Sequence, residues 1–557
     1  MGADPTPGPA TKRKTDSGPG PSTGTPADHD QAAPDRPPWE GNLPVRYYDW
    51  IAHHGRRTPD KVAMVDLGSG RRFTYAQSDA RISRLAAHLR DTHKVARGDR
   101  VAVLALNTSD TLEVQFACGR LGAVFLPLNT RLTVPELQFI VGDASPKVMI
   151  HDGDLAETAL NVARLCNVSS TLRLGPDGSY EAGIAAAQPI ETFAPVTLDD
   201  ISTIMYTSGT TGQPKGAIIT HGMTFFNCVN LGGLAYISPS SVFLCVLPLF
   251  HTGGLNCYTN PVLHAGGTVL IMRSFDPGEA LRLTSDPAER INVFFGVPAI
   301  YQFMAQHPSF ASADFGRLMI GGVGGAPMPV PLLKVWEARG VALQQGYGMT
   351  ETSPAVMALD REDAARKAGS AGKPVLHTEV RIVRPDGTDA DVGELGELWV
   401  RGPNITPGYW NRPDANASSF TDGWLHTGDA TRVDEEGFYY IVDRWKDMYI
   451  SGGENVYPAE VENVLHQIAA VAEAAVIGIP DEQWGEVGMA IVAVKPGQTL
   501  TPADIHAHCS ANLARFKCPR IIEFVEALPR NATGKIHKPT LRKQFAEQKP
   551  TDLAQAS

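Results

Sequence analysis

The sequence predicts an α/β protein: a large N-terminal domain with parallel-type α/β layers and a small antiparallel β subdomain, followed by a small α+β C-terminal domain. Two observations predict the layers and the subdomain. Short apolar runs alternate with helical patterns from Tyr47 to Phe295, whereas short strands separated by turns follow between Val375 and Val400. At 557 residues the chain is also too long for one ordinary core, which indicates two to four domains.

The elements of the N-terminal domain follow from the length and spacing of its apolar runs. Val101–Leu106 predicts a buried strand, Thr111–Leu121 a helix and Ala123–Leu128 a second strand, the order that is typical of parallel sheets. The alternation then resumes at Val242–Leu247, Gly267–Met272 and Val293–Phe295. Turn sequences such as Pro385-Asp386-Gly387 separate the strands of the antiparallel subdomain.

The two ends of the chain differ from its middle. The N-terminal segment is rich in Pro, Gly, Thr, Ala and Asp and lacks hydrophobic periodicity, which indicates disorder. Near the C-terminus, Phe438–Val442 and Asp447–Ser451 resemble paired strands, and Pro458 is well placed to begin a helix. The expected bounds are 1–40 for a disordered tail, 41–443 for the N-terminal domain, 444–545 for the C-terminal domain and 546–557 for a polar tail.

Composition argues against several classes of protein. The net charge of −11, from 49 basic and 60 acidic side chains, is unlike that of a dedicated nucleic-acid binder. No apolar run approaches the length of about 18 residues that a membrane-spanning helix needs. No secretory signal is recognisable. The seven cysteines are scattered and form no C-x-x-C pair, which indicates reduced thiols in a cytoplasmic protein rather than a disulfide framework or a zinc site.

The stretch Tyr206–Gly216 (YTSGTTGQPKG) carries the strongest functional signal, and it follows the apolar run Ile201–Met205. It contains three glycines, four Ser/Thr hydroxyls and a lysine. Glycines let backbone N–H groups approach an anion, hydroxyls donate hydrogen bonds and the lysine supplies charge, so the loop suits an oligophosphate. It is not a Walker A motif, because two residues separate Gly212 from Lys215.

Two further motifs could complete a nucleotide site, and each has a plainer interpretation. Thr350 and Glu351, at the end of Tyr347–Glu351, place a hydroxyl beside a carboxylate, which suits a phosphate oxygen and Mg²⁺; a simple turn fits about equally well. Gly321–Pro327 could let a flat base lie against the backbone because glycine has no Cβ, or it could form a tight strand-to-helix turn.

Two charged positions are also candidates. Asp429, which follows Thr427-Gly428, could accept both hydroxyls of a ribose, and Arg444 could donate to the same sugar; for each, a surface ion pair is the alternative. Lys535 ends the turn-rich stretch Asn531–Lys535, where a flexible cationic side chain could reach another domain's site. Taken alone, such a lysine is more often a solvated surface residue.

Together these segments resemble the adenylate-forming superfamily of acyl-CoA synthetases, nonribosomal adenylation domains and beetle luciferases. The resemblance covers about Tyr47 to Leu541. It depends on the order and spacing of Tyr206–Gly216, Tyr347–Glu351, Thr427–Asp429, Asp443-Arg444 and Asn531–Lys535. Members of the family form an acyl-adenylate from a carboxylate and ATP with release of pyrophosphate, and many then transfer the acyl group to a thiol.

The resemblance implies a role for each matched residue. The residues implied to hold the ATP phosphates are Thr207, Ser208, Gly209, Thr210, Thr211, Gly212 and Lys215. Those implied elsewhere on the nucleotide are Thr350 at the α-phosphate, Glu351 as the Mg²⁺ ligand, Gly325, Ala326 and Pro327 beside the adenine, Tyr347 stacked on it, and Asp429 and Arg444 at the ribose. Lys535 is the implied cation that bridges the acid carboxylate and the α-phosphate.

The resemblance also implies that the C-terminal domain is mobile and rotates between the two half-reactions. The hinge falls at Lys446, and Gly452 and Gly453 then line the path of the pantetheine thiol of coenzyme A. Trp445–Glu460 is more similar to fatty acyl and aryl CoA ligases than to peptide-synthetase domains, and no carrier motif follows Lys535. Free coenzyme A is therefore the favoured acceptor over a separate carrier protein.

The acid is less well specified. By analogy His251 positions or gates the acyl group, and the other pocket candidates are Phe226, Val297, Gly322 and Gly346. None is cationic, so an apolar acid is expected, with a medium or long fatty chain slightly favoured over an aromatic or cyclic acid. A luciferase-type oxidase and a non-enzymatic AMP-binding module are weaker alternatives. The expected partners are the acid, ATP and coenzyme A without nucleic acid, and a homodimer is left open.

Overall fold

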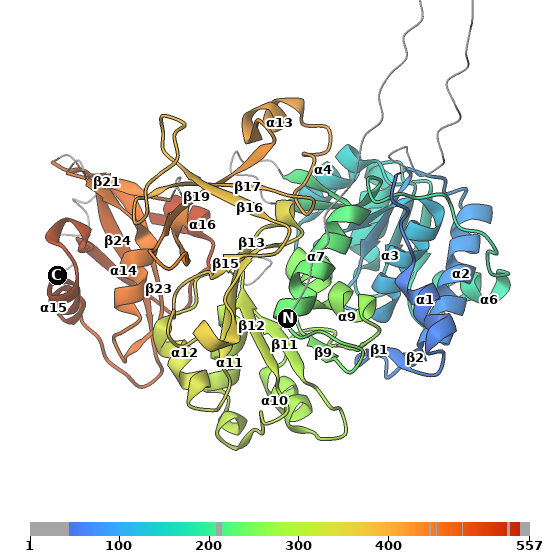
Figure 1. Cartoon of the computed structure of the whole chain (residues 1–557), viewed down its shortest axis with the longest axis horizontal. Coiled ribbons are helices and arrows are strands. Elements are labelled where there is room, and N and C mark those ends of the chain that lie inside the picture. Colours follow the sequence, from blue (N-terminus) through green and yellow to red (C-terminus); the bar gives the residue numbers. More distant parts are fainter. Residues whose placement is uncertain are drawn as a thin grey trace, which may run out of the picture. The chain divides into compact units, whose positions relative to one another are not determined.

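The computed structural model describes residues 44–207, 214–444, 447–452, 454–481, 483–531 and 535–545. The chain divides into two units, Met1–Pro44 and Val45–Ser557, and every element below belongs to the second (Figure 1). The tails expected at residues 1–40 and 546–557 lie outside the described residues.

One mostly parallel sheet has the strand order β6-β5-β3-β4-β7-β8, in which β8 alone runs antiparallel to its neighbour. Its strands are β3 (Arg100–Leu104), β4 (Val124–Pro127), β5 (Val148–His151), β6 (Ser170–Arg173), β7 (Ile201–Thr207) and β8 (Lys215–Thr220). The helices that connect or follow them are α3 (Ser109–Leu121), α4 (Val134–Ala144), α5 (Ala156–Leu165), α6 (Ser179–Ala186) and α7 (His221–Leu234).

A second sheet has the order β15-β14-β13-β12-β11-β9-β10-β1-β2, parallel from β13 to β1 and antiparallel at both edges. Its strands are β1 (Val62–Asp66), β2 (Arg72–Thr74), β9 (Val242–Cys245), β10 (Thr268–Ile271), β11 (Val293–Gly296), β12 (Ile320–Gly324), β13 (Leu343–Gly348), β14 (Ala355–Ala358) and β15 (Lys373–Pro374). The helices of this part are α1 (Trp50–Arg57), α2 (Tyr75–Asp91), α8 (Thr252–Gly254), α9 (Asn260–His264), α10 (Pro277–Ser285), α11 (Pro298–Gln306) and α12 (Val330–Glu337).

Helix α3 lies between these two sheets, because it contacts β3, β4 and β7 of the first and β1 of the second. A helix in such a place is enclosed on every side, so its polar side chains need partners. Glu113 is fully buried and pairs with Arg81 of α2, with Oε1 of Glu113 2.6 Å from Nε of Arg81. Asp110, also buried, pairs with Arg71 at 2.8 Å.

A third, antiparallel sheet follows, in which β16 pairs with β17, β17 with β19, and β19 with both β18 and β20. The strands are β16 (Glu379–Val383), β17 (Gly396–Arg401), β18 (Phe420–Thr421), β19 (Trp424–Val433) and β20 (Tyr439–Arg444), and α13 (Pro413–Ser419) precedes β18. Along β17 buried and partly exposed residues alternate, as expected for a sheet with one face against a core.

The C-terminal sheet has the order β22-β21-β24-β23, with β25 parallel to β24 (orange to red in Figure 1). Its elements are β21 (Tyr449–Ser451), β22 (Glu454–Val456), α14 (Pro458–Leu465), β23 (Val471–Asp481), β24 (Gly485–Val494), α15 (Pro502–Asn512), β25 (Ile521–Val525) and α16 (Lys538–Phe545). The predicted pairing of Phe438–Val442 with Asp447–Ser451 is wrong: β20 pairs with β19, whereas β21 pairs with β22 and β24.

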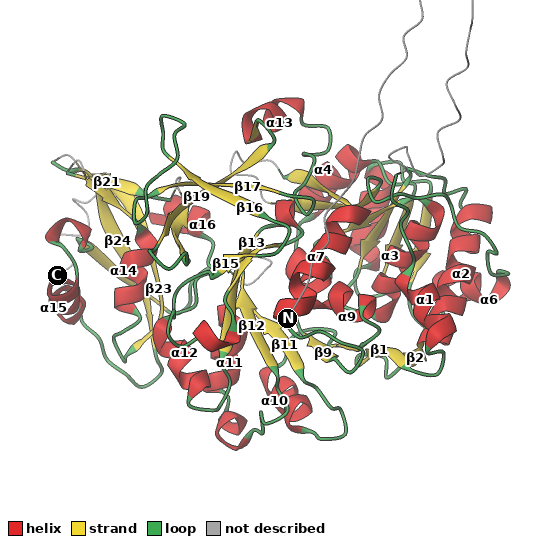
Figure 2. Cartoon of the chain, viewed as in Figure 1, coloured by secondary structure: helices red, strands yellow, loops and turns green. Residues whose placement is uncertain are grey.

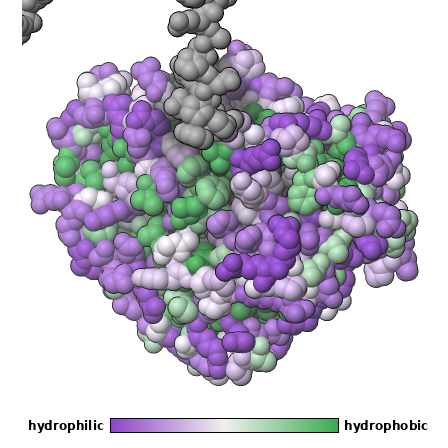
Figure 3. Space-filling view, turned by 45° about the vertical axis from the view of Figure 1, so that its right-hand side comes forward, coloured by the Kyte–Doolittle hydropathy of each residue, from purple (hydrophilic) through white to green (hydrophobic). Residues whose placement is uncertain are grey.

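The predicted fold class is confirmed, with helices packed around parallel sheets first and antiparallel strands later in the chain (Figure 2). On the face shown in Figure 3, hydrophilic side chains interrupt the hydrophobic ones. Within the described ranges, no helix combines the length and the apolar character that crossing a membrane requires.

Candidate active site

The predicted phosphate loop connects β7 to β8. The two strands form an antiparallel pair in which Thr207 lies opposite Lys215 and Tyr206 opposite Gly216. The loop is therefore the tip of a hairpin whose base is fixed by the ladder. Its central residues Ser208, Gly209, Thr210, Thr211 and Gly212 lie outside the described residues.

Tyr409 connects this hairpin to the Thr350-Glu351 pair. The ammonium nitrogen of Lys215 lies 5.3 Å from the centroid of the Tyr409 ring, and the Tyr409 hydroxyl donates to Oε1 of Glu351 at 2.8 Å. Thr350 and Glu351 are both buried, in a single 3-10 turn after β13. One aromatic side chain thus contacts both a cation and a carboxylate, groups that suit a metal-bound phosphate.

Asp429 and Arg444 occupy opposing positions on β19 and β20, which explains why both belong to one cluster. Nε of Arg444 lies 2.7 Å from Oδ1 of Asp429, and the Tyr347 hydroxyl donates to Oδ2. Burial raises the pKa of Asp429, and the charge of Arg444 opposes that rise. The predicted ribose-binding pair is therefore preassembled, with the predicted adenine-stacking tyrosine bonded to it.

Lys535 comes to the same place from the far end of the chain. An ideal Cβ built on Gly325 would lie 3.3 Å from Cε of Lys535 and 3.7 Å from Nζ. Gly325 follows β12 at φ +84°, where a side chain is strained, and Ala326 and Pro327 continue the same turn. The lysine therefore lies directly against the predicted adenine-binding turn.

Two hydrogen bonds join Lys535 to Asn531. The amide of Lys535 donates to Oδ1 of Asn531 at 3.0 Å, and the amide of Asn531 donates to the carbonyl of Lys535 at 2.7 Å. Burial and then the charge of Arg444 lower the pKa of Lys535, Asp429 and Glu351 oppose both effects, and the net pKa is about 8. Lys535 is therefore a buried cation whose charge interacts with two carboxylates and an arginine.

His251 is the N-cap of α8, and its Nδ1 accepts the N–H of Gly253 at 3.1 Å. Burial, and then the charge of Lys535, lower the pKa of His251 to about 3. The ring is therefore neutral at physiological pH, and because Nδ1 is an acceptor, the proton is on Nε2. His251 can donate one hydrogen bond to an oxygen beside Lys535.

Several acyl-pocket candidates lie near this cluster. Gly324 and Gly346 are opposed on β12 and β13, and the Val297 side chain would lie 3.4 Å from a Cβ on Gly325. On Gly322 a Cβ would come within 2.8 Å of the Tyr258 hydroxyl and 2.9 Å of the Phe295 ring. Phe226 is on α7 instead, with its ring centroid 5.2 Å from that of His377.

The predicted thiol path begins in the turn after β21. Gly452 lies in the turn after β21 at φ +63°, and its N–H donates to the carbonyl of Trp484 at 2.9 Å. A Cβ there would approach the Trp484 ring to 2.6 Å, so the turn packs on the residue that precedes β24. Gly453 and the predicted hinge Lys446 lie outside the described residues.

Comparisons with known proteins show which family the chain is similar to. A model of the AMP-binding enzyme family matches residues 51–410, and a model of the AMP-binding enzyme C-terminal domain matches residues 460–535. A feruloyl-CoA synthase from Amycolatopsis sp is 44% identical over 498 residues, 89% of this chain and 98% of the relative.

Two further similarities bear on the acid. A long-chain-fatty-acid–CoA ligase from Mycobacterium tuberculosis is 38% identical over 495 residues, 88% of this chain and 97% of the relative. The structure of the o-succinylbenzoate CoA synthetase from Bacillus subtilis in complex with its acyl-adenylate intermediate superposes with a TM-score of 0.81 at 32% identity, covering 89% of this chain and 98% of that one.

Proposed function

The chain belongs to the AMP-binding enzyme family as an AMP-forming acid–CoA ligase, and we propose that its acid carries an aromatic ring. The enzyme converts a carboxylic acid and ATP to an acyl-adenylate and pyrophosphate, and then transfers the acyl group to coenzyme A. The proposal concerns the acid, the roles of individual residues and the metal.

The proposal of an aromatic acid is based on the packing around Gly322. Tyr258 and Phe295 meet edge to face, with ring centroids 5.4 Å apart, and both lie against the bare backbone of Gly322. Aromatic rings beside glycine offer a flat apolar wall, and they fill the space that an extended alkyl chain would need. This choice differs from the slight preference for fatty acids that the pocket residues gave, and the feruloyl-CoA synthase relative supports it.

Charge is the main obstacle to adenylation, because a carboxylate attacks a phosphate that already carries negative neighbours. In our proposal Asp429 and Arg444 hold the ribose. Lys215 and the hairpin loop hold the phosphates. Lys535 lies between the acid carboxylate and the α-phosphate. A fixed cation at the developing charge supplies electrostatic stabilisation, usually the largest catalytic contribution. The acid is ionised at neutral pH and needs no general base.

Magnesium fits beside Glu351. This carboxylate is buried, receives the Tyr409 hydroxyl on one oxygen, and has Thr350 as its neighbour, so hard oxygen ligands converge there. Among the described residues no cluster of three or more His, Cys, Asp or Glu could hold a metal ion, which suits an ion held mainly by substrate phosphates. When bound, Mg²⁺ neutralises phosphate charge.

The second half-reaction requires a different set of residues at the site. We assign the thiol path to the turn that contains Gly452 and Gly453, presented after rotation of the C-terminal domain about Lys446. Because Gly452 packs on Trp484 rather than beside Lys535, this assignment needs such a rotation. A homodimeric assembly and a cytoplasmic location belong to the same proposal.

The substrate class can be tested by mass spectrometry of the products from ATP, Mg²⁺, coenzyme A and a panel of acids. The panel pairs ferulate and indoleacetate with octanoate and palmitate. We expect aryl-CoA thioesters with kcat/KM at least about tenfold above those for the fatty acids. Faster reaction with a fatty acid would overturn the aromatic assignment. Adenylates without thioesters would instead indicate a carrier-protein acceptor.

The lowered pKa of Lys535 predicts a pH dependence. As pH rises above about 8, the free enzyme loses the ammonium charge, so kcat/KM for ATP in pyrophosphate exchange should fall. Bound phosphates favour the charged lysine, so kcat should fall only at higher pH. The measurement is a profile from about pH 6 to 10. A kcat/KM that stays flat across this range would contradict the assignment of Lys535.

A further inference from the structure

Asp429, which contacts Arg444 and Tyr347, lies in a bulge of β19. Glu397 of β17 pairs with Ala430 of β19, and Trp399 pairs with His426. An advance of two residues along β17 therefore corresponds to four residues along β19. The extra residues are accommodated at Thr427, Gly428 and Asp429, with Gly428 at φ +71°. A bulge of this kind redirects a side chain, but it removes backbone amides from the ladder.

Side chains satisfy the amides of this bulge. The Thr427 hydroxyl donates to the carbonyl of Leu398 at 2.7 Å and accepts the N–H of Asp429 at 3.1 Å. The N–H of Gly428 donates to Oε1 of Glu397 at 3.0 Å. The bulge is therefore tied to β17 at two points, one of which is a carboxylate on the neighbouring strand.

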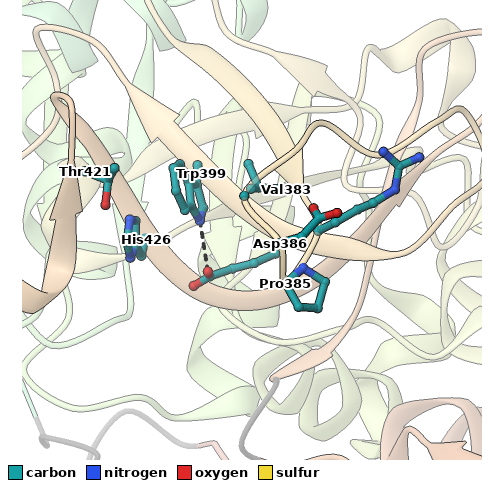
Figure 4. Close-up of a pocket in the computed structure, with 9 residues that line it drawn as sticks. Val383, Pro385, Asp386, Trp399, Thr421 and His426 are labelled. Carbon is teal, nitrogen blue, oxygen red and sulfur yellow. Dashed lines mark hydrogen bonds between the residues drawn. The ribbon is translucent and has the colours of Figure 1, made fainter.

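Glu397 is itself held in place. Its Oε2 accepts the indole N–H of Trp399 at 2.9 Å, and the Trp399 ring stacks on His426 with centroids 4.1 Å apart (Figure 4). These side chains line a cavity of about 380 Å³ on the partly exposed face of the sheet, and no predicted nucleotide-binding residue lines it. Leu398 and Val400, which alternate with them on β17, are fully buried.

We infer that Glu397 is a positioning residue for nucleotide binding: its carboxylate fixes the Gly428 bulge and so aims the Asp429 carboxylate at the ribose hydroxyls. Glu397 acts from behind the site, through one backbone hydrogen bond, and does not touch the nucleotide. The inference rests on the proposed role of Asp429, and it assigns a function to a side chain outside every motif of the sequence analysis.

Discrimination between ATP and 2′,3′-dideoxy-ATP in pyrophosphate exchange tests this inference. Wild type should prefer ATP because Asp429 accepts the ribose hydroxyls. Glu397→Ala leaves the Gly428 amide without its acceptor, and the ratio of the two kcat/KM values should fall about tenfold. Glu397→Gln keeps the side-chain shape and one acceptor, so the ratio should fall less. A merely structural loss would lower both kcat/KM values and leave their ratio unchanged, which would overturn the inference.

Two further variants separate the possible failures. Trp399→Phe removes the indole hydrogen bond that helps to hold Glu397 but keeps an aromatic ring and the carboxylate that accepts the Gly428 N–H, so the ratio should fall less than in Glu397→Ala; a larger fall would assign the effect to general damage of the sheet. Asp429→Ala should abolish the discrimination, and adding Glu397→Gln should then change nothing further. If Asp429→Ala keeps the discrimination, the ribose assignment fails, and the inference fails with it.

Discussion

Replacing Lys535 with alanine should lower the rate of acyl-adenylate formation by about 1,000-fold. The lysine is the cation beside Gly325, and the developing charge at the α-phosphate would lose its fixed counter-charge in a site that excludes water. Thioester formation from supplied acyl-adenylate should stay within about threefold of wild type, because the bond between the acid carboxylate and the α-phosphate already exists in that substrate. Pyrophosphate exchange and a thioester assay measure the two steps separately.

Two variants show whether charge and position are responsible. Lys535→Met keeps most of the apolar stem and should be as defective as Lys535→Ala. Lys543→Ala removes an exposed lysine from α16 of the same domain and should affect neither step. Because burial disfavours the charged form of Lys535, removing it should not lower the free energy of unfolding, which thermal denaturation can check. Equal loss of both steps in Lys535→Ala would contradict the assigned role.

Several residues of the predicted site lie together in the structure because they belong to short motifs at the ends of strands. Local strand pairing alone brings two of these pairs together: Thr207 with Lys215, and Asp429 with Arg444. Gly325 and Gly428 both have positive φ, the first in a turn and the second in a bulge, and glycine favours such positions.

Tyr409 and Glu397 could not be predicted, because each acts through a partner that sequence spacing does not indicate. Tyr409 lies next to the phosphate hairpin through a bridge to Ala217 and its contact with Lys215, both far away in the chain. The partner of Glu397 depends on a bulge in the next strand. The wrong pairing of Phe438–Val442 has the same origin, since an alternating pattern predicts a strand but not its neighbour.

Glu351→Gln should lower adenylation by about 100- to 1,000-fold, with a smaller loss at high Mg²⁺ concentration. Glutamine keeps the shape of the side chain and an oxygen that can accept the Tyr409 hydroxyl, so the change isolates the negative charge that a magnesium ligand needs. Thioester formation from supplied acyl-adenylate should be nearly unaffected, since pyrophosphate has then left. Adenylation measured over a range of Mg²⁺ concentrations gives both the rate and the apparent metal affinity.

Tyr409→Phe is the matched control for Glu351→Gln. It removes the 2.8 Å hydrogen bond to Glu351 but leaves the carboxylate charged and the aromatic ring beside Lys215. One hydrogen bond to a charged group should cost about tenfold in adenylation, well below the loss in Glu351→Gln, with the Mg²⁺ dependence close to wild type. If Glu351→Gln kept the wild-type Mg²⁺ dependence, or if Tyr409→Phe were equally defective, Glu351 would be orienting the turn after β13 rather than binding the metal.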